Sequence, residues 1–306
     1  MENLVAYSLV TYRNPSGPRS GLVIGDDVYD IGELLQKSAY VSVRGILDDW
    51  EVAAPQLTDA AATDHANAFP LSELELLPPV AYPGAIYCAG ANYRDHVDNM
   101  ARRLNIAPEP DPHELGLSPW HFIKSSWCAV GDGAKVELAS NFLDWEAELA
   151  VVIGRIARNI PIERVFDYVA GYTIGNDLSA RDRIQRDAVH IASPFRYDWI
   201  GQKSFDGACP LGPWIVPASE VPDPQELKIR TYVNDKIKQD SNTRKMLFTT
   251  AEQIAHLASR ITLHPGDVIL TGTPAGVGAE TGERLAKGDR VRVQIEKIGQ
   301  LTTYIV

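Results

Sequence analysis

The stretch 143–154, LDWEAELAVVIG, restricts the fold and the chemistry of this chain more than any other segment. Around 146–153 it alternates and then becomes wholly apolar, which predicts a β-strand. Residues two apart on a strand project from the same face, so Glu146 and Glu148 are expected side by side. Adjacent carboxylates repel each other, and burial raises that cost unless a cation lies between them. A solvated strand edge would also explain the spacing, but the pattern favours a metal site.

Asp177 ends a second apolar run, AGYTIGND, and could complete a set of three carboxylates. Carboxylate oxygens without a neighbouring histidine or cysteine suit a hard divalent ion, so Mg²⁺ or Mn²⁺ is expected before Zn²⁺. Ca²⁺ could take the same place in crystals. We therefore predict a metal site formed by Glu146, Glu148 and Asp177.

Composition excludes several classes of protein. The net charge of −11 provides no basic surface for nucleic acid or for an anionic membrane. No apolar run is long enough to span a bilayer, and the first residues do not resemble a secretion signal. Cys88, Cys128 and Cys209 are too far apart for a zinc motif and are expected to be reduced thiols. These features predict a cytoplasmic protein that binds neither nucleic acid nor membrane.

The chain divides near residue 75, where prolines 70, 78, 79 and 83 mark a connector. We expect a small α+β domain over 1–75 and a larger domain over 76–306. The first has strand patterns at 3–12 and 21–31, with a turn at residues 25–27, and helical patterns at 31–37, 42–50 and 57–67.

Strand patterns dominate the second domain, at 85–89, 121–124, 147–154, 171–176, 213–217, 227–233, 267–271 and in the alternating end of the chain. An amphipathic helix is expected at 160–172, and another after Thr249, which forms a capping box with Glu252. Strands outnumber helices and do not alternate with them. The expected class is therefore mixed α/β and rich in β-structure, rather than a doubly wound parallel sheet.

Three further features suggest chemistry. His96 follows a strand in a predicted loop and could be a general base, although a surface histidine is the alternative. Lys203 lies among turn-forming residues and could neutralise a substrate oxygen, with a surface lysine as the alternative. The run 269–278, ILTGTPAGVG, could hold a carboxylate with backbone N–H groups. It lacks the ending of a phosphate loop, and no serine-hydrolase or HExxH motif is present.

Six segments in order resemble the fumarylacetoacetate hydrolase family: NYRDH at 92–96, LDWEAELAVVIG at 143–154, AGYTIGNDLSARD at 170–182, GQKSFDGACPLGPWIVP at 201–217, QDSNT at 239–243 and ILTGTPAGVG at 269–278. The resemblance extends over about 80–306 and is greatest to bacterial acylpyruvate hydrolases and 2-hydroxyhepta-2,4-diene-1,7-dioate isomerases. It implies a mixed β-sandwich roll, a homodimer, and a Mg²⁺ or Mn²⁺ site. The small N-terminal domain also resembles that of bacterial members.

The resemblance also implies roles for individual residues. It assigns the metal to the same three carboxylates, catalysis to His96, Lys203 and Arg181, and substrate contacts to Tyr93, Gln185, Asp206 and Thr273.

Two departures from the family pattern stand out. Many acylpyruvate-cleaving relatives have a glutamate three residues after the histidine, where this chain has Asn99. Gln185 matches the family glutamine only if one residue is inserted.

The segments 100–119 and 186–199 are longer than in typical relatives and could form a lid. We considered that closure of this lid supplies the missing acidic partner of His96 from one residue of a set: Glu109, Asp111, His113 or Glu114.

The expected function is a metal-dependent hydrolase that cleaves a carbon–carbon bond in a β-diketo acid, such as an acylpyruvate or fumarylpyruvate, through a metal-bound enolate. Catabolism of aromatic or related compounds is the expected setting. The same site could instead decarboxylate oxaloacetate or isomerise 2-hydroxymuconate-type acids, which need no activated water. A metal-binding interaction module without catalysis is a third alternative.

Overall fold

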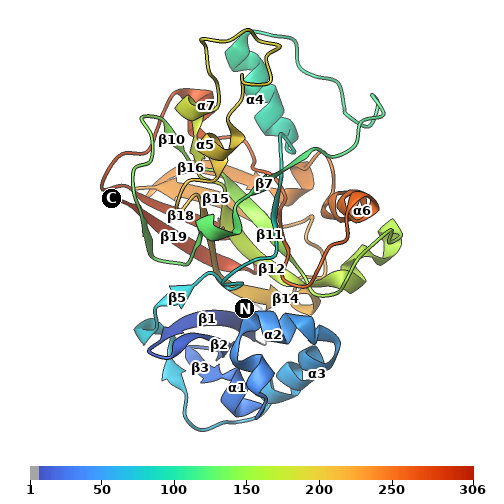
Figure 1. The fold of residues 1–306 in the computed structure, drawn as a ribbon, viewed down its shortest axis with the longest axis vertical. Coiled ribbons are helices and arrows are strands. Elements are labelled where there is room, and N and C mark those ends of the chain that lie inside the picture. Colours follow the sequence, from blue (N-terminus) through green and yellow to red (C-terminus); the bar gives the residue numbers. More distant parts are fainter. Residues whose placement is uncertain (1–6) are drawn as a thin grey trace.

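The computed structural model describes residues 7–306. The first four residues of the strand expected at 3–12 lie outside this range. Within it, the predicted β-rich mixed α/β class is confirmed: three sheets account for most of the regular structure, and short helices lie around them (Figure 1).

The largest sheet has twelve strands and includes strands from both ends of the chain. Ten of them follow one path, and two short strands pair beside it. In path order they are β4 (Phe69–Pro70), β3 (Asp27–Asp30), β2 (Gly17–Ile24), β1 (Ser8–Asn14), β14 (Cys209–Pro217), β12 (Val169–Asn176), β11 (Ala147–Ile153), β17 (Val268–Leu270), β6 (Ile86–Ala89) and β7 (His121–Lys124), with β5 (Leu76–Leu77) beside β1 and β8 (Ala129–Val130) beside β14.

A second sheet has five strands, and a third has two. The five are β16 (Lys236–Asn242), β15 (Lys228–Val233), β18 (Arg290–Ile295), β19 (Gly299–Ile305) and β9 (Ala134–Val136); the two are β10 (Leu143–Asp144) and β13 (Ser179–Ala180). The α-helices are α1 (Ile31–Leu34), α2 (Val43–Asp48), α3 (Trp50–Ala61), α4 (Arg94–Leu104), α5 (Trp199–Lys203), α6 (Thr250–Arg260) and α7 (Gly278–Thr281). The 3₁₀ turns are Ser38–Val41, Leu71–Glu73, Ser126–Cys128, Ile162–Tyr168, Arg181–Arg183, Ala218–Glu220 and Thr243–Lys245.

Strand β11 lies between β12 and β17 in the largest sheet, and every residue in it is buried. It pairs antiparallel with β12 on one side and with β17 on the other. Its side chains alternate between two apolar clusters: Ala150 and Val152 belong to one, and Leu149, Val151 and Ile153 to the other. Since both faces are covered, carboxylates at the end of this strand are held in low-dielectric surroundings.

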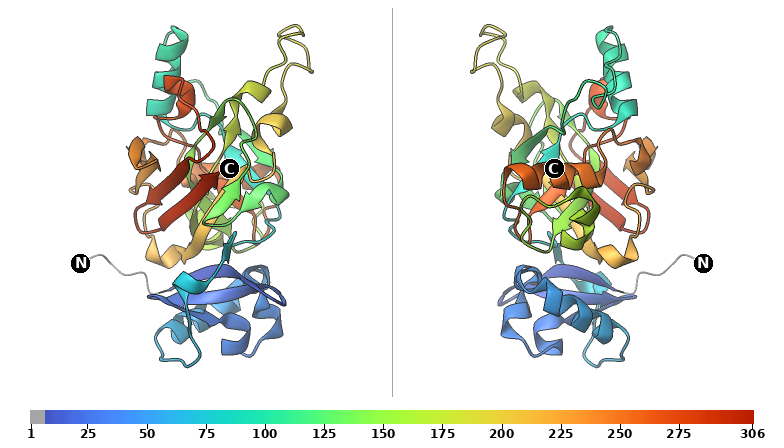
Figure 2. Two further views of the ribbon diagram at one scale, coloured as in Figure 1. Left: turned by 90° about the vertical axis from the view of Figure 1, so that its left-hand side faces the viewer. Right: turned by 90° about the vertical axis from the view of Figure 1, so that its right-hand side faces the viewer.

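The N-terminal part of the described chain lies at one end of the molecule, drawn in blue in Figures 1 and 2. It is joined to the rest by backbone pairing, because Leu9 of β1 lies opposite Ile215 of β14. The sheet is therefore continuous across the connector, and a domain division at residue 75 stays a prediction.

Several expected elements differ in the structure. The helix predicted at 160–172 is a 3₁₀ segment that ends at Tyr168, because β12 begins at Val169 and pairs on both sides. Helix α3 begins at Trp50, earlier than the predicted 57–67. The capping box of Thr249 and Glu252 is confirmed at the start of α6. Over residues 7–306, no helix combines the length and apolar character that crossing a membrane requires.

Candidate active site

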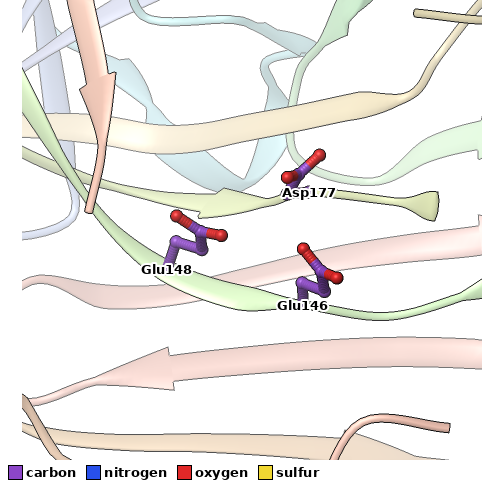
Figure 3. Close-up of side chains that lie close together, drawn as sticks. All are labelled: Glu146, Glu148 and Asp177. Atoms are coloured by element: carbon purple, nitrogen blue, oxygen red, sulfur yellow. The ribbon is translucent and has the colours of Figure 1, made fainter. Parts of the chain in front are cut away.

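The three predicted metal ligands converge. One oxygen each from Glu146, Glu148 and Asp177 lies within 4.8 Å of the others, and all three residues are buried. Figure 3 shows the two glutamates on one stretch of chain, Glu148 in β11 and Glu146 just before it, with Asp177 close to them. The β11–β12 pairing places Ala147 opposite Asn176. Glu146, just before β11, and Asp177, just after β12, therefore lie next to each other. The Asp177 backbone N–H donates to the Glu146 carbonyl oxygen at 2.9 Å, which locks this arrangement.

Three buried or partly buried cations surround the acidic cluster. Lys203 Nζ donates to Glu146 Oε2 at 2.8 Å and to Asp177 Oδ2 at 2.7 Å. Lys124 Nζ donates to the other oxygen of Asp177 and to the Leu178 carbonyl oxygen at 3.3 Å. Sequence reasoning missed Lys124, because nothing in the segment 121–124 indicates that this lysine is buried.

Arg181 connects the cluster to a fourth carboxylate. Its Nε donates to Asp144 Oδ2 at 2.9 Å, and its Nη2 donates to Glu146. Asp144 is fully buried and was also missed, although it extends the two-residue spacing of Glu146 and Glu148 backwards by one step. Four carboxylates thus face three cations, so the cluster has a net charge of −1 when all four are ionised and no metal is bound.

Glu146 and Glu148 differ in their electrostatics. Burial acts to raise the pKa of Glu146, but the charges of Lys203 and Arg181 outweigh it and hold that pKa below its usual value. Burial, followed by the charges of Asp177 and Glu146, raises the pKa of Glu148 well above the ordinary range. Its side chain accepts only one hydrogen bond within the described residues, from the Gly272 N–H at 2.5 Å. A carboxyl group that is costly to ionise beside two carboxylates fits a site that binds a divalent cation.

We predict that metal binding displaces a proton from Glu148. Its raised pKa means that it still holds a proton at pH values where an ordinary glutamate is ionised, and a cation requires the ionised form. Mn²⁺ affinity should therefore fall about tenfold for each pH unit below that pKa, with about one proton released per ion. Calorimetric titrations in buffers of different ionisation enthalpy would measure the release. Affinity independent of pH between about pH 5 and pH 8 would contradict this linkage.

His96 is paired with a residue that the sequence analysis did not identify. It lies in the first turn of α4, not in the predicted loop, and its Nδ1 is 2.6 Å from Glu280 Oε1. Because an ionised carboxylate only accepts hydrogen bonds, Nδ1 is the donor and Nε2 keeps its lone pair. His96 also lines the cavity that contains the acidic cluster, so this ring can act as a base there.

Asn99 has a clear role next to this pair. Its Nδ2 donates to Glu280 Oε2 at 2.8 Å, and the Gly276 N–H donates to the same oxygen at 2.8 Å. An amide at position 99 donates to Glu280, whereas the glutamate found in many acylpyruvate-cleaving relatives would repel it. The acidic partner of His96 in this structure lies on α7, 184 residues along the chain from the histidine.

The idea that a lid residue supplies the acidic partner is wrong for this structure. His113 Nε2 is 2.8 Å from Glu252 Oε1 at the start of α6, and His113 Nδ1 is 2.9 Å from Asp111. The Glu109 carbonyl accepts a hydrogen bond from Arg94, and Glu114 is exposed. This segment is fixed to another surface, and His96 already has Glu280.

The Arg181–Asp144 pair and the His96–Glu280 pair are connected through the backbone of α7. Asp144 accepts hydrogen bonds from the Gly278 N–H at 2.6 Å and the Ala279 N–H at 2.9 Å. It therefore fixes the start of the short helix that carries Glu280, while Arg181 joins it to Glu146. Gly276 must be glycine: its φ is +103°, and a Cβ there would lie 2.0 Å from the Lys238 carbonyl oxygen.

Asn99→Asp is expected to destabilise the protein by about 1–3 kcal/mol at neutral pH, because it replaces a donor to Glu280 with a like charge. The loss should shrink near pH 4, where carboxylates take up protons. Urea unfolding at both pH values would measure the difference. Asp98→Asn, one residue earlier on an exposed side of α4, is the control and should be nearly neutral. Equal losses in the two variants would count against the assigned contact.

The remaining predicted residues separate into two groups. Thr273 lines the cavity, and its hydroxyl accepts a hydrogen bond from Gln239 at 2.8 Å. Tyr93 lies in the apolar core beneath α4 and does not line the cavity. Gln185 and Asp206 are exposed and lie outside it, and Gln185 accepts from Arg196 at 3.1 Å. The structure therefore brings Thr273 to the site, but not Tyr93, Gln185 or Asp206.

The cavity has a volume of about 220 Å³ and joins the acidic cluster to His96. Its lining also includes Gln202, which sequence reasoning missed, and a group of aromatic side chains. A larger cavity of about 920 Å³ lies beside Trp214 and strands of the five-stranded sheet. It contains none of the acidic cluster, so its size does not make it the site of the chemistry.

The fold and the site define a class: β-rich proteins with a buried three-carboxylate site for a divalent metal. The family model for the C-terminal domain of fumarylacetoacetate (FAA) hydrolase matches residues 85–306. An uncharacterized protein of Staphylococcus aureus (strain USA300) is 39% identical over 250 residues, which cover 80% of this chain and 75% of the relative. The chain belongs to the fumarylacetoacetate hydrolase family.

Solved structures of similar fold include enzymes of two kinds. The maleylpyruvate hydrolase of Sphingobium sp. SYK-6 is 28% identical, with a TM-score of 0.75 over 98% of this chain and 99% of that one. The same enzyme has been solved in complex with manganese(II) and pyruvate. The 5-carboxymethyl-2-hydroxymuconate delta-isomerase of Mycobacterium smegmatis is 29% identical, with a TM-score of 0.70 over 98% of both chains. The family therefore includes hydrolases and isomerases, and a metal is present in one hydrolase.

Proposed function

We propose that this protein is a divalent-metal-dependent hydrolase that cleaves a carbon–carbon bond in an acylpyruvate-type β-diketo acid. The observation that supports this most directly is that His96, paired with Glu280, lines the same cavity as Glu146 and Glu148. Hydrolysis needs a base for water next to a site that holds a 2-oxo acid, and a histidine beside a candidate metal site supports this reaction.

Glu146, Glu148 and Asp177 would hold the metal, and the resemblance to a manganese–pyruvate complex supports Mn²⁺ or Mg²⁺. A bound divalent ion supplies Lewis-acid polarisation of the oxygens at the 2-oxo acid end of the substrate. Lys203 adds a fixed positive charge at this end of the cavity, where negative charge develops as the bond breaks. Thr273 supplies a hydroxyl for orienting the substrate.

His96 Nε2 takes a proton from water, and Glu280 stabilises the resulting imidazolium through Nδ1. The water oxygen bonds to the carbonyl carbon of the acyl group. The bond from that carbon to the central CH₂ then breaks, and its electron pair remains on the pyruvate fragment as an enolate, which takes up a proton. One β-diketo acid and one water thus give a carboxylic acid and pyruvate.

The acidic partner of His96 distinguishes this proposal from its rivals. Decarboxylation of oxaloacetate and isomerisation of a 2-hydroxymuconate-type acid require no activated water. Asn99 in place of a glutamate favoured those two reactions because it left His96 without an acidic partner in the sequence pattern. Glu280 is that acidic partner, so this reason no longer applies. One structural neighbour is an isomerase, which is the specific ground for keeping isomerisation as the alternative reaction.

A substrate panel tests the proposal. Acylpyruvates, fumarylpyruvate and oxaloacetate are incubated with Mg²⁺- or Mn²⁺-loaded protein, and pyruvate, the released acid and CO₂ are quantified. We expect equal amounts of pyruvate and acid from an acylpyruvate, and loss of activity after chelation. CO₂ release from oxaloacetate without cleavage of any acylpyruvate would establish the decarboxylase alternative instead.

A further inference from the structure

Three aromatic rings form one side of the active-site cavity: Trp120, Phe122 and Trp199, here called the aromatic wall. Their ring centroids are 5.7 Å apart for Trp120 and Phe122, 5.3 Å for Trp120 and Trp199, and 5.4 Å for Phe122 and Trp199. Lys203 Nζ lies 5.1 Å from the centroid of Phe122. The wall therefore begins beside the acidic cluster and continues away from it.

The outer part of the wall reaches solvent. Trp120 is 51% exposed and Trp199 is 40% exposed, whereas Phe122 is more deeply placed. Large apolar rings gathered at the mouth of a cavity, next to catalytic groups, are characteristic of a surface that covers an apolar part of a ligand.

The backbone fixes the rings of the wall. A Cβ at Gly90 would lie 2.0 Å from the Trp120 ring, so this indole packs directly against the glycine backbone. Trp199 begins α5 and precedes Lys203 by four residues, so both lie on one face of the helix. Asp198 caps that helix by accepting the Gly201 N–H at 2.8 Å. The projecting segment before α5 is anchored beside it by Arg186, which is 2.7 Å from Asp198 (Figure 2).

The charges of the cavity lining exclude a second anionic group. Among the described residues that line it, Arg181 and Lys203 are the only lysine or arginine side chains, and both are already paired with carboxylates at the metal end. Apart from His96, Glu146 and Glu148, the other polar side chains in the lining are neutral: Thr273 and Gln202, whose Oε1 is buried without a hydrogen-bond partner. A carboxylate beside the aromatic wall would lose hydration without gaining a cation.

We propose that the aromatic wall selects a substrate whose acyl group is aromatic and uncharged, such as an aroylpyruvate, over substrates that carry a second carboxylate. This inference rests on the proposed function for the position of the 2-oxo acid end. Stacking on the three rings gives the affinity, and the lack of a free cation gives the discrimination.

Binding of stable 2-oxo acids tests the wall without turnover. With Mn²⁺-loaded protein, phenylpyruvate should bind at least about tenfold more tightly than 2-oxoglutarate, which has a carboxylate instead of the ring. Trp199→Ala should weaken phenylpyruvate binding about tenfold and leave pyruvate binding unchanged. Trp199→Arg should reverse the preference. Trp127→Ala removes an exposed tryptophan outside the cavity and is the matched control, with no expected change.

The outcomes separate this inference from the proposed reaction. Equal binding of the two ligands, binding of neither, or identical effects of Trp199→Ala and Trp127→Ala would overturn the aromatic selectivity. If the preference and its dependence on Trp199 hold but no acylpyruvate is cleaved, the wall stands and the hydrolase assignment fails. If an anionic substrate such as fumarylpyruvate is cleaved faster than benzoylpyruvate, the hydrolase assignment stands and the selectivity fails.

Discussion

Glu148→Gln should lower metal-dependent turnover by at least about a thousandfold while the protein keeps its fold. The amide has nearly the shape of the carboxyl group but cannot provide the negative charge that a divalent cation requires. Stability should change little, since no cation is paired with Glu148 within the described residues and its pKa is raised. Mn²⁺ binding, thermal unfolding and steady-state turnover, measured on one preparation, would check all three parts.

Asp177→Asn is the instructive comparison. Asp177 accepts hydrogen bonds from both Lys203 and Lys124, which are buried. Its neutralisation leaves Lys203 with Glu146 alone and takes from Lys124 the carboxylate with which it is paired. A loss of about 3–5 kcal/mol of stability should accompany the loss of metal binding. Full activity of Glu148→Gln in the presence of Mn²⁺, or a stability loss as large as that of Asp177→Asn, would contradict the distinct electrostatic roles given to the two carboxylates.

His96→Asn should lower acylpyruvate hydrolysis by about 10²–10⁴-fold and leave Mn²⁺ affinity unchanged, because it removes the base but none of the metal ligands. Glu280→Gln should have a smaller effect of the same kind, since the imidazole remains but loses the negative charge that faces Nδ1. Any oxaloacetate decarboxylation by the wild type should survive both substitutions.

The measurement that matters is the effect of each substitution on acylpyruvate hydrolysis compared with its effect on oxaloacetate decarboxylation. A general fall in all activities would mean that His96 and Glu280 hold the structure of the site rather than activate water. Glu283→Gln, three residues after Glu280 on an exposed position paired with Lys238, is the matched control and should retain full hydrolysis. Hydrolysis by His96→Asn at the wild-type rate would rule out the assigned base.

The metal ligands could be predicted because they follow a local rule. Glu146 and Glu148 share a strand face by their spacing, and Asp177 ends the strand that pairs with it. The β-rich fold class could be predicted for the same reason. The alternation of polar and apolar residues within a strand is visible without knowing which strand pairs with it. Thr273 also reached the cavity as expected, since its loop leaves β17 next to β11.

Contacts between distant segments could not be predicted in this way. The spacing 96–99 pointed to a missing acid at Asn99, but it carries no information on Glu280, which the fold brings close from 184 residues away. Lys124 and Asp144 become visible as site residues only when β7, β10 and β12 are placed together. Helix α4 was missed because its exposed, charged sequence is weakly apolar and its packing comes from Asn92 and Asp95, which bond to Phe248 and Ser241.

The most direct test is a crystal of the protein soaked in Mn²⁺ and measured at a wavelength where manganese scatters anomalously. The account predicts one strong peak with an oxygen of Glu146, of Glu148 and of Asp177 each at about 2.1–2.2 Å, with further positions open towards the cavity. A peak at another place, or three carboxylates turned apart with no peak between them, would contradict it.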